Sequence, residues 1–524
     1  MRTIWLSLLA LIVAMTPGQA TLASAPSAPD DGAFLAVAEP NAPIQLKVMT
    51  FNIWYGGVQV SFPAVIETIR RADPDIIGIQ EPDGNLALIA EAAGYGYIDP
   101  RRNIISRYPI FDSGIGERTE TGPTPYSITG LDAAALHAWV MVRPGQVVAV
   151  SNTHLPSDPY GPEAVRDGAT REAVLAMETR VRVPEARPLT VLGELGKSGV
   201  PVFITGDFNA PSHLDWTEAM QSVRPSVITY PVDWPASRLL ASSGLRDSYR
   251  EAHPDPTIRP GLTWTAGMPY PYVRPRETLD RIDFVWAGGP VRTLASAIIG
   301  ETGGPDVDIG MPLYPSDHRS VVSTFEVVPI DAPSLIAVEP RRIVQGEDFR
   351  VRGHVAGSET WSVVLVARDA ALDTATKGAI GELEAWRRAA HFASNDMAAG
   401  DYDAVLLDTA GRARQRARFT IVSRDATPRI TVTRQADTGA SGLQVSWSNA
   451  PGNRHDWIGI YRAGEVNVTG SLAIVYTDAR FNGSLDLPLT SEEGPLPPGA
   501  YEARLMRDDS FAILAVAPFT IEDH

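Results

Sequence analysis

The feature that most constrains this chain is a pattern that recurs between Gln45 and Val328. A short apolar run ends in polar residues and is followed by a loop or a helix-like stretch. Runs of about four to eight residues rich in β-branched side chains predict buried strands. The clearest predicted strands are Leu46–Phe51, Ile76–Gln80, Val147–Asn152, Val202–Thr205, Arg281–Trp286 and Ser320–Glu326, and the clearest predicted helices are Pro63–Arg71 and Arg171–Val181. Because strands and helices are interleaved, the sequence predicts a mixed α and β domain.

After Pro329 the pattern changes to short strands separated by Gly, Pro and Asp, with one helix-like patch at Gly381–Ala390. A chain of 524 residues is expected to divide, because single hydrophobic cores stop growing near about 300 residues. Two segments of this region are similar to two later ones, with a period of about 100 residues. Gly400–Ala404 matches Gly499–Ala503, and Phe419–Ile421 matches Phe519–Ile521. The repeat predicts two successive all-β sandwiches of immunoglobulin-like architecture.

The N-terminus has the features of a secretory signal peptide. Arg2 stands near the start, an apolar run extends from Ile4 to Met15, and small residues at Ala20 and Ala25 offer cleavage sites. A retained membrane anchor is disfavoured because this run is shorter than the ~20 apolar residues that span a bilayer. The protein is therefore expected to be secreted or periplasmic.

The expected domain organisation follows from these boundaries. A signal peptide occupies 1–25, and a flexible leader rich in Ala, Pro and Ser occupies 26–43. The mixed α and β domain spans 44–329, the first β-sandwich module 332–423 and the second 427–522. No apolar stretch after the N-terminal one reaches the length of a membrane span, so no integral membrane contact is expected.

Composition excludes several classes of function. The chain has no cysteine, which rules out cysteine nucleophiles, thiolate zinc sites, iron–sulfur clusters and disulfides. Its formal net charge of −17 argues against a general nucleic-acid-binding surface, because nonspecific affinity for polyanions comes mainly from Lys and Arg. A locally basic cleft is compatible with this charge.

The densest chemical signal is the segment Ile204–His213, an apolar strand followed by Asp207 and Asn209. Residues two apart on a strand share a face, so these two side chains are expected to point together. A carboxylate beside an amide is suited to binding a metal ion or a phosphoryl oxygen. The structural alternative is an Asp/Asn turn after a strand.

Two further segments place acids and histidine near strand ends. Asp317 and His318 directly precede the predicted strand Ser320–Glu326. Adjacent side chains on a strand diverge, so these two are expected to serve different partners. Asp283 lies inside an apolar strand, where a carboxylate is costly unless it is paired, and a histidinium is a suitable partner. The alternatives are a loop histidine without a functional role and a buried structural aspartate.

Polar side chains also end three other predicted strands. Asn52 and Glu81 follow the strands Leu46–Phe51 and Ile76–Gln80, and His154 follows Val147–Asn152. Oxygen ligands of this kind suit Mg²⁺, Mn²⁺ or Ca²⁺, and the lack of a compact histidine cluster disfavours zinc.

Together these segments resemble the endonuclease/exonuclease/phosphatase superfamily. The matching motifs are T-F-N-I-W, D-I-I-G-I-Q-E, S-R-Y-P-I, N-T-H-L, G-D-F-N, R-I-D-F and S-D-H-R, spread over about Leu46–Val327. Every polar position expected of that family is filled. The resemblance implies a four-layer α/β/β/α sandwich, in which two mixed β-sheets pack face to face with helices outside.

The resemblance also implies a role for each candidate residue. Glu81 is expected to be the main metal ligand with Asn52 nearby, and Asp317 to contribute to metal binding. Asp283 is expected to orient His318, which acts on the attacking water or on the phosphoryl oxygens. His154 and Asn209 are expected to hold the phosphate, and Asp207 to position the nucleophile or to manage a proton.

The function expected from this site is that of an exported, divalent-metal-dependent phosphoester hydrolase. A phosphodiesterase using metal-assisted in-line attack by water fits best, with Mg²⁺ as the first choice of metal and Mn²⁺ or Ca²⁺ as alternatives. The substrate classes are a small molecule, a lipid headgroup or a nucleic acid. The alternatives are a secreted or periplasmic endonuclease, and a surface-binding protein whose β-sandwich modules bind a surface or carbohydrate.

Loops are expected to select the substrate. Arg259–Glu277 carries Trp264, Tyr270, Tyr272, Arg274 and Arg276, and Gly300–Tyr314 carries Asp306 and Asp308. Aromatic and Arg side chains are suited to stacking on a base or clamping a phosphate, but a packed Pro-rich loop explains them equally well. Gly196–Ser198 is similar to the end of a P-loop, yet Val191 stands where that motif requires Gly. A surface turn is expected there.

Overall fold

The computed structural model describes residues 42–112, 136–265, 278–357, 360–368, 389–434 and 443–522, apart from short gaps at 454, 469, 478–479, 488, 492–493 and 509. The expected signal peptide, nearly all of the leader and most of the patch Gly381–Ala390 lie outside the described residues. No helix within these ranges is long and apolar enough to cross a membrane.

The first sheet of the mixed α and β domain has seven strands in the order β12-β11-β13-β1-β2-β4-β3. Its strands are β1 (Ile44–Asn52), β2 (Ile76–Gln80), β3 (Tyr97–Asp99), β4 (Ile104–Ser106), β11 (Val291–Glu301), β12 (Ile309–Met311) and β13 (Ser320–Val327). The central pair, β1 and β2, is parallel, and β13 runs antiparallel to β1. Three predicted strands, Leu46–Phe51, Ile76–Gln80 and Ser320–Glu326, correspond to β1, β2 and β13 and are confirmed.

The second sheet also has seven strands, in the order β5-β6-β7-β8-β10-β9 with β14 on β7. They are β5 (Ile110–Asp112), β6 (Ala138–Arg143), β7 (Gln146–His154), β8 (Val202–Asp207), β9 (Arg246–Asp247), β10 (Asp283–Gly288) and β14 (Ile330–Asp331). Here β7 and β8 are parallel and β10 is antiparallel to β8. The strand predicted at Arg281–Trp286 begins later, at Asp283, and the backbone N–H of Ile282 just before it donates to Oγ1 of Thr263 at 3.0 Å.

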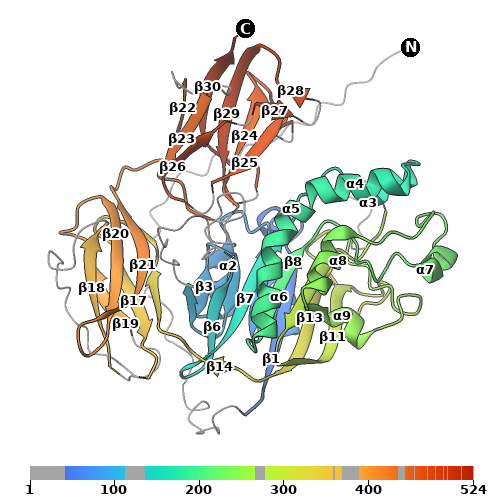
Figure 1. The fold of residues 1–524 in the computed structure, drawn as a ribbon, viewed down its shortest axis with the longest axis horizontal. Helices are drawn as coiled ribbons and strands as arrows, with labels where there is room; N and C mark the ends of the chain where they lie inside the picture. The colour runs from blue at the N-terminus through green and yellow to red at the C-terminus, as the bar shows by residue number, and fades with distance from the viewer. Residues whose placement is uncertain are drawn as a thin grey trace. The chain divides into compact units, whose positions relative to one another are not determined.

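Apolar side chains of both sheets share one core, which includes Leu46 and Val48 of β1 and Val148, Val150 and Phe203 of β7 and β8. Helices α1 (Phe62–Ala72) and α2 (Leu86–Ala93) pack on the first sheet. Helices α5 (Val183–Ala186), α6 (Thr190–Lys197) and α8 (Pro235–Ser242) pack on the second (Figure 1). The remaining helices are α3 (Gly161–Arg166), α4 (Arg171–Val181), α7 (Glu218–Val223) and α9 (Ser248–Ala252). The predicted mixed α and β domain is confirmed.

Helix α1 shows how local sequence determines an element of this domain. Ser61 caps its N-terminus by accepting the N–H of Ala64 at 3.3 Å, and Asp73 ends it in the left-handed conformation. The predicted face of Val65, Ile66 and Ile69 is buried against the first sheet. The apolar spacing therefore predicts both the helix and its buried side.

The two sheets lie close together where Gly78 of β2 faces β7 and β8. A Cβ atom on Gly78 would overlap Oγ1 of Thr205 and Oδ1 of Asn152. That Oδ1 atom accepts hydrogen bonds from Nε2 of Gln80 at 2.6 Å and from Oγ1 of Thr205 at 2.9 Å. A buried polar layer therefore joins the sheets just below the ends of β1, β2, β7 and β8.

Replacing Gly78 with alanine is expected to destabilise the domain by about 1–3 kcal/mol or more, because the added methyl group must displace buried, hydrogen-bonded side chains. Chemical unfolding of the full-length variant measures the change. Gly96→Ala is the matched control, since a Cβ there meets nothing within 4 Å. Equal stability of the two variants would show that the sheets are not held this closely.

The region after β14 is β-rich and contains several sheets. The first part consists of β15 (Leu335–Glu339), β16 (Arg342–Val344), β17 (Asp348–His354), β18 (Ser362–Ala367), β19 (Ala389–Ala393), β20 (Gly400–Leu407) and β21 (Ala413–Val422). The second part consists of β22 (Arg429–Arg434), β23 (Leu443–Ser448), β24 (Trp457–Arg462), β25 (Ala473–Tyr476), β26 (Gly483–Asp486), β27 (Thr490–Ser491), β28 (Gly494–Pro495), β29 (Gly499–Met506) and β30 (Ile513–Ile521). Each part has its own apolar core.

The sequence repeat corresponds to one hairpin that occurs in both parts. In the β20–β21 hairpin Tyr402 pairs with Phe419, and in the β29–β30 hairpin Tyr501 pairs with Phe519. The rings are stacked in both cases, with centroids 5.5 and 5.6 Å apart. The repeated residues therefore include a cross-strand aromatic pair that stabilises the equivalent hairpin in each part.

Candidate active site

All candidate residues lie at one edge of the two sheets. Asn52 ends β1 and Glu81 follows β2, while His154 and Asp207 end β7 and β8. Asp283 begins β10, and Asp317 and His318 precede β13. Carboxyl ends of parallel strands and amino ends of their antiparallel neighbours meet at the same edge of a sheet. Strand direction alone therefore gathers these side chains.

The second sheet contributes a row of three residues. His154, Asp207 and Asp283 are direct cross-strand partners on β7, β8 and β10. Nε2 of His154 lies 3.4 Å from Oδ2 of Asp207. Neighbouring residues in such a row have Cβ atoms about 5 Å apart, so their polar ends converge.

Asn52 connects this row to the first sheet. Its Nδ2 donates to Oε1 of Glu81 at 3.0 Å and to Oδ2 of Asp207 at 3.1 Å. Its Oδ1 accepts the N–H of Trp54 at 3.0 Å. Asn52 is fully buried, so this amide has a fixed position between the two sheets.

His318 lies between two carboxylates. Its Nδ1 is 3.0 Å from Oδ2 of Asp283, and its Nε2 is 3.6 Å from Oδ2 of Asp207. Burial alone would lower the pKa of His318, but the charges of Asp283 and Asp207 outweigh burial and raise this pKa to about 10. Burial would raise the pKa of Asp207, yet His318 and His154 lower it to about 2. The arrangement favours an imidazolium flanked by carboxylates.

Asn209 lies in the site, but its backbone position differs from the predicted one. The expectation that Asp207 and Asn209 share a strand face is wrong, because β8 ends at Asp207 and Asn209 adopts a left-handed conformation with φ of 46°. The backbone N–H of Asn209 donates to Oδ1 of Asp207 at 2.9 Å. Its Nδ2 lies 3.0 Å from Nε2 of His154 and donates to the carbonyl of Leu155 at 2.9 Å. A turn, and not strand alternation, joins these side chains.

Two hydroxyl groups support the site without having been singled out in the sequence. Oγ of Ser316 donates to the carbonyl of Asn52 at 2.7 Å and accepts the N–H of His318 at 3.1 Å. Oγ1 of Thr263 accepts the N–H of Asp283 at 3.2 Å. Ser316 is the first residue of the S-D-H-R motif, but nothing local distinguishes Thr263. Its role depends on a contact with a distant segment.

A left-handed backbone segment borders the site on the side of Glu81. Glu81 itself has φ of 56°, and Trp54, Tyr55 and Gly56 have φ of 58°, 44° and 74°. Oε2 of Glu81 accepts the N–H of Tyr55 at 2.9 Å, and its carbonyl accepts the N–H of Gly56 at 2.8 Å. Non-glycine residues in this conformation are strained, and such strain clusters at functional sites.

Glu81 and Asp317 have the character of a cation site. No Lys or Arg in the described part of the chain forms an ion pair with either carboxylate. Burial raises the pKa of Asp317 to about 7, with the charge of His318 opposing the rise and that of Glu81 adding to it. Neighbouring carboxylates that no Lys or Arg neutralises fit a hard divalent cation such as Mg²⁺. The residues present therefore suit the expected metal.

A second group in the site also has metal-binding geometry. One potential ligand atom each from Asp207, Asp283 and His318 lies within 4.8 Å of the others. This group differs from the predicted set of Asn52, Glu81 and Asp317. Two carboxylates already hold the histidinium closely, whereas Glu81 and Asp317 form no ion pair with a Lys or Arg among the described residues. The chemistry of the donors favours the predicted set.

The loops expected to select the substrate are described only in part. Trp264 lies next to His318, with ring centroids 6.3 Å apart. Arg259 donates to Asp308 at 2.9 Å, so it connects the two predicted loops through a carboxylate. Tyr270, Tyr272, Arg274 and Arg276 lie outside the described residues. Gly196 and Lys197 lie in the last turn of α6 and Ser198 is its C-cap, so the expected surface turn is a helix end in which Gly196 is buried and exposed Lys197 pairs with Glu194 at 2.8 Å.

Comparisons with known proteins agree with this geometry. The model of the Endonuclease/Exonuclease/phosphatase family matches residues 49–318. A protein of Caenorhabditis elegans, described as uncharacterized protein F14F9.5, is 30% identical over 303 residues, which cover 54% of this chain and 92% of that protein.

The solved structures that match this chain include three with TM-scores between 0.31 and 0.34. An endonuclease/exonuclease/phosphatase from Beutenbergia cavernae is 16% identical with a TM-score of 0.34, covering 91% of this chain and 100% of its own. D. rerio TDP2 complexed with a single strand DNA product is 17% identical with a TM-score of 0.32, covering 54% and 98%. The mannosyl-6-phosphatase Bt3783 of Bacteroides thetaiotaomicron is 19% identical with a TM-score of 0.31, covering 53% and 99%.

Proposed function

Because this protein belongs to the endonuclease/exonuclease/phosphatase family of phosphoester hydrolases, we propose that it is an exported, divalent-metal-dependent phosphodiesterase. The observation that carries the proposal is the pair of adjoining groups at one sheet edge. His318 lies between Asp283 and Asp207, and the carboxylates of Glu81 and Asp317 lie beside them without a Lys or Arg partner among the described residues. Hydrolysis of a phosphoester requires both a cation for the phosphoryl oxygens and fixed groups around the attacking water.

The proposed metal is Mg²⁺, with Mn²⁺ or Ca²⁺ as alternatives, and its ligands are Glu81, Asp317 and Asn52. When bound, such an ion supplies positive charge to the phosphoryl oxygens and lowers the pKa of a coordinated water. The support is the oxygen-rich donor set and the effect of the Glu81 charge on Asp317.

The chain's own groups have complementary proposed roles. Asp207 is approached by the polar ends of Asn52, His154 and His318, so a carboxylate at this central position is suited to orient a water molecule. His154 and Asn209 carry N–H groups at adjoining strand ends, where they are suited to hold phosphoryl oxygens. His318, held by Asp283, donates to a phosphoryl oxygen or acts on the water. Positioning and charge neutralisation carry most of the rate enhancement in phosphoryl chemistry.

A substrate panel tests the proposal. Purified full-length protein is incubated with Mg²⁺, or with EDTA, and with bis-p-nitrophenyl phosphate, p-nitrophenyl phosphate, sphingomyelin, RNA or plasmid DNA. We expect Mg²⁺-dependent hydrolysis of a small or lipid diester to exceed hydrolysis of the monoester. Preferred cleavage of DNA or RNA would instead identify an endonuclease. Hydrolysis of none of these substrates with any divalent metal would reject the enzymatic proposal.

Finer features of the architecture belong to the same proposal. The α/β/β/α layering is supported by the core that the two sheets share and by the helices packed on each sheet. Immunoglobulin-like modules at 332–423 and 427–522 are supported by the repeated hairpin and by a separate core in each part. We propose that these modules bind a surface or a carbohydrate.

Export is proposed from the N-terminal sequence alone. A mature protein in the periplasm or medium is expected to begin near residue 26, after removal of the signal peptide at 1–25. N-terminal sequencing of protein from fractionated cells measures this. Recovery of an uncleaved chain in the cytoplasmic fraction would contradict export while leaving the enzymatic proposal intact.

A further inference from the structure

Asp280 is a buried carboxylate beside the site that the proposed chemistry does not use. Only 1% of its surface is exposed. Its Oδ1 accepts the indole N–H of Trp216 at 2.9 Å, and its Oδ2 accepts the hydroxyl of Tyr160 at 3.2 Å. A guanidinium nitrogen of Arg224 lies 3.7 Å from Oδ1. Burial raises the pKa of Asp280 to about 6, and these partners oppose the rise.

The two hydrogen-bond donors come from the loops that begin at the proposed phosphate-holding residues. Tyr160 lies on the loop that follows His154 at the end of β7. Trp216 lies on the loop that follows β8 and contains Asn209. Asp280 itself lies on the segment that leads into Asp283. One carboxylate therefore joins the chain segments that carry three proposed site residues.

Asp280 also contacts the backbone of Trp264, which lies next to His318. The N–H of Trp264 donates to the carbonyl of Asp280 at 3.0 Å, and the N–H of Asp280 donates to the carbonyl of Trp264 at 2.8 Å. The backbone of Trp264 forms a second β-bridge with His318. The ring of Tyr160 packs edge-on against that of Trp264, with centroids 5.4 Å apart. The hydroxyl that Asp280 holds thus belongs to the ring that supports Trp264.

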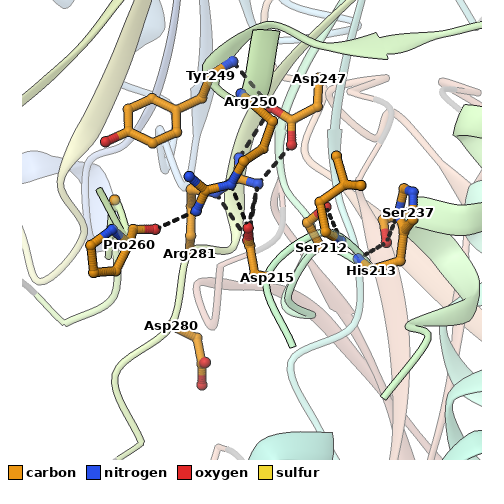
Figure 2. A network of polar contacts seen from close by, with 12 residues as sticks. Ser212, His213, Asp215, Ser237, Asp247, Tyr249, Arg250, Pro260, Asp280 and Arg281 are labelled. Carbon is orange, nitrogen blue, oxygen red and sulfur yellow. Dashed lines mark hydrogen bonds and ion pairs between the residues drawn. The ribbon is translucent and has the colours of Figure 1, made fainter. Parts of the chain in front are cut away.

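The next residue, Arg281, also holds this segment in place, through two ion pairs. Its guanidinium pairs with Asp215 at 2.9 Å and with Asp247 at 2.7 Å. Figure 2 shows these contacts, with the carboxyl group of Asp280 pointing away from them. The loop after β8 is therefore attached by two successive residues, Asp215 to Arg281 and Trp216 to Asp280.

We propose that Asp280 is a positioning residue, which holds the loops of His154 and Asn209 and, through Tyr160 and Trp264, the surroundings of His318 in one arrangement. The inference rests on the proposed function. A carboxylate is suited to this task because it accepts two donors from different loops at once, whereas the asparagine of equal size has a single acceptor oxygen. A displacement of about 1 Å in such a site costs about 100-fold in rate.

The test compares full-length variants on the best substrate of the panel. Asp280→Asn removes the charge and one acceptor, and Tyr160→Phe removes only the hydroxyl group. We expect kcat to fall about 10- to 100-fold in Asp280→Asn and about 3- to 10-fold in Tyr160→Phe, with KM changed less than about threefold. The double variant is expected to lose less than the product of the single effects, because both act through one hydrogen bond. Mn²⁺ affinity, measured by calorimetry without substrate, is expected to be unchanged.

Matched controls separate positioning from general stability. Asp75→Asn changes a carboxylate that accepts the N–H of Lys47 at 2.8 Å near the start of β1, away from the site edge. Tyr95→Phe removes a hydroxyl that donates to the carbonyl of Pro74 at 2.6 Å. Both controls are expected to keep the wild-type kcat.

Three results would overturn the positioning role, and a fourth would reject the proposed function. Wild-type kcat in both Asp280→Asn and Tyr160→Phe would overturn the positioning role, as would a loss of activity equal to the unfolded fraction seen by circular dichroism. Equal losses in the Asp75 and Tyr95 controls would also overturn it. Failure of the wild-type protein to hydrolyse any panel substrate would instead reject the proposed function, so the two failures are distinguishable.

Discussion

Replacing His318 with alanine is expected to lower kcat by about 100- to 10,000-fold while leaving the protein folded. The imidazole is the group held by Asp283 at 3.0 Å with its second nitrogen near Asp207, so its loss removes the donor that faces the proposed water and phosphate. Steady-state hydrolysis of bis-p-nitrophenyl phosphate, or of the best panel substrate, measures kcat and KM separately. KM is expected to change much less than kcat, because the lost interaction acts mainly in the transition state.

The His318 result needs a test of folding, because the substitution leaves two buried carboxylates without their cation. His318→Gln retains a hydrogen-bond donor of similar reach and is expected to remain folded, with a loss of kcat comparable to that of His318→Ala. Asp283→Asn is expected to lose less activity, since it leaves the imidazole in place but weakens its orientation. Normal turnover in a folded His318 variant would remove His318 from the catalytic machinery.

Replacing Glu81 with alanine is expected to abolish metal-dependent turnover because it removes a proposed metal ligand. Glu81 is the carboxylate that contacts Asn52 at 3.0 Å and adds its charge to that of Asp317, so its removal takes away the main proposed ligand. Loss of a principal metal ligand weakens affinity by well over the 10- to 100-fold seen for residues that merely orient ligands. Calorimetric titration with Mg²⁺ or Mn²⁺ measures the affinity, and EDTA treatment of the wild-type protein gives the metal-free activity.

The two substitutions together distinguish the two possible metal sites. If Glu81, Asp317 and Asn52 bind the ion, Glu81→Ala loses metal affinity and His318→Ala keeps it. If the ion is bound by Asp207, Asp283 and His318 instead, the order is reversed. The same titration therefore either supports the proposed ligands or replaces them, whatever the substrate proves to be.

Much of the fold follows from local patterns in the sequence. The strand Ile76–Gln80 and the helix Arg171–Val181 have the predicted bounds, and α1 extends one residue beyond the prediction at each end. These elements are predictable because apolar spacing and capping residues act over a few neighbouring positions. The later start of β10 was not predictable in this way. At this point the hydroxyl of Thr263, from another part of the chain, accepts the N–H groups of Ile282 and Asp283.

The candidate site likewise has features that local sequence predicts and features that it does not. Local sequence predicts which polar side chains stand at strand ends, because a buried apolar run that stops at Asp, Asn, Glu or His is a local feature. Their contacts with one another arise from the tertiary structure. Asn52 meets Asp207 across two sheets, Asn209 turns back to His154, and Asp280 joins loops that no local pattern connects. Such contacts depend on how strands pair and sheets pack, which are long-range interactions that the spacing of residues along the chain does not specify.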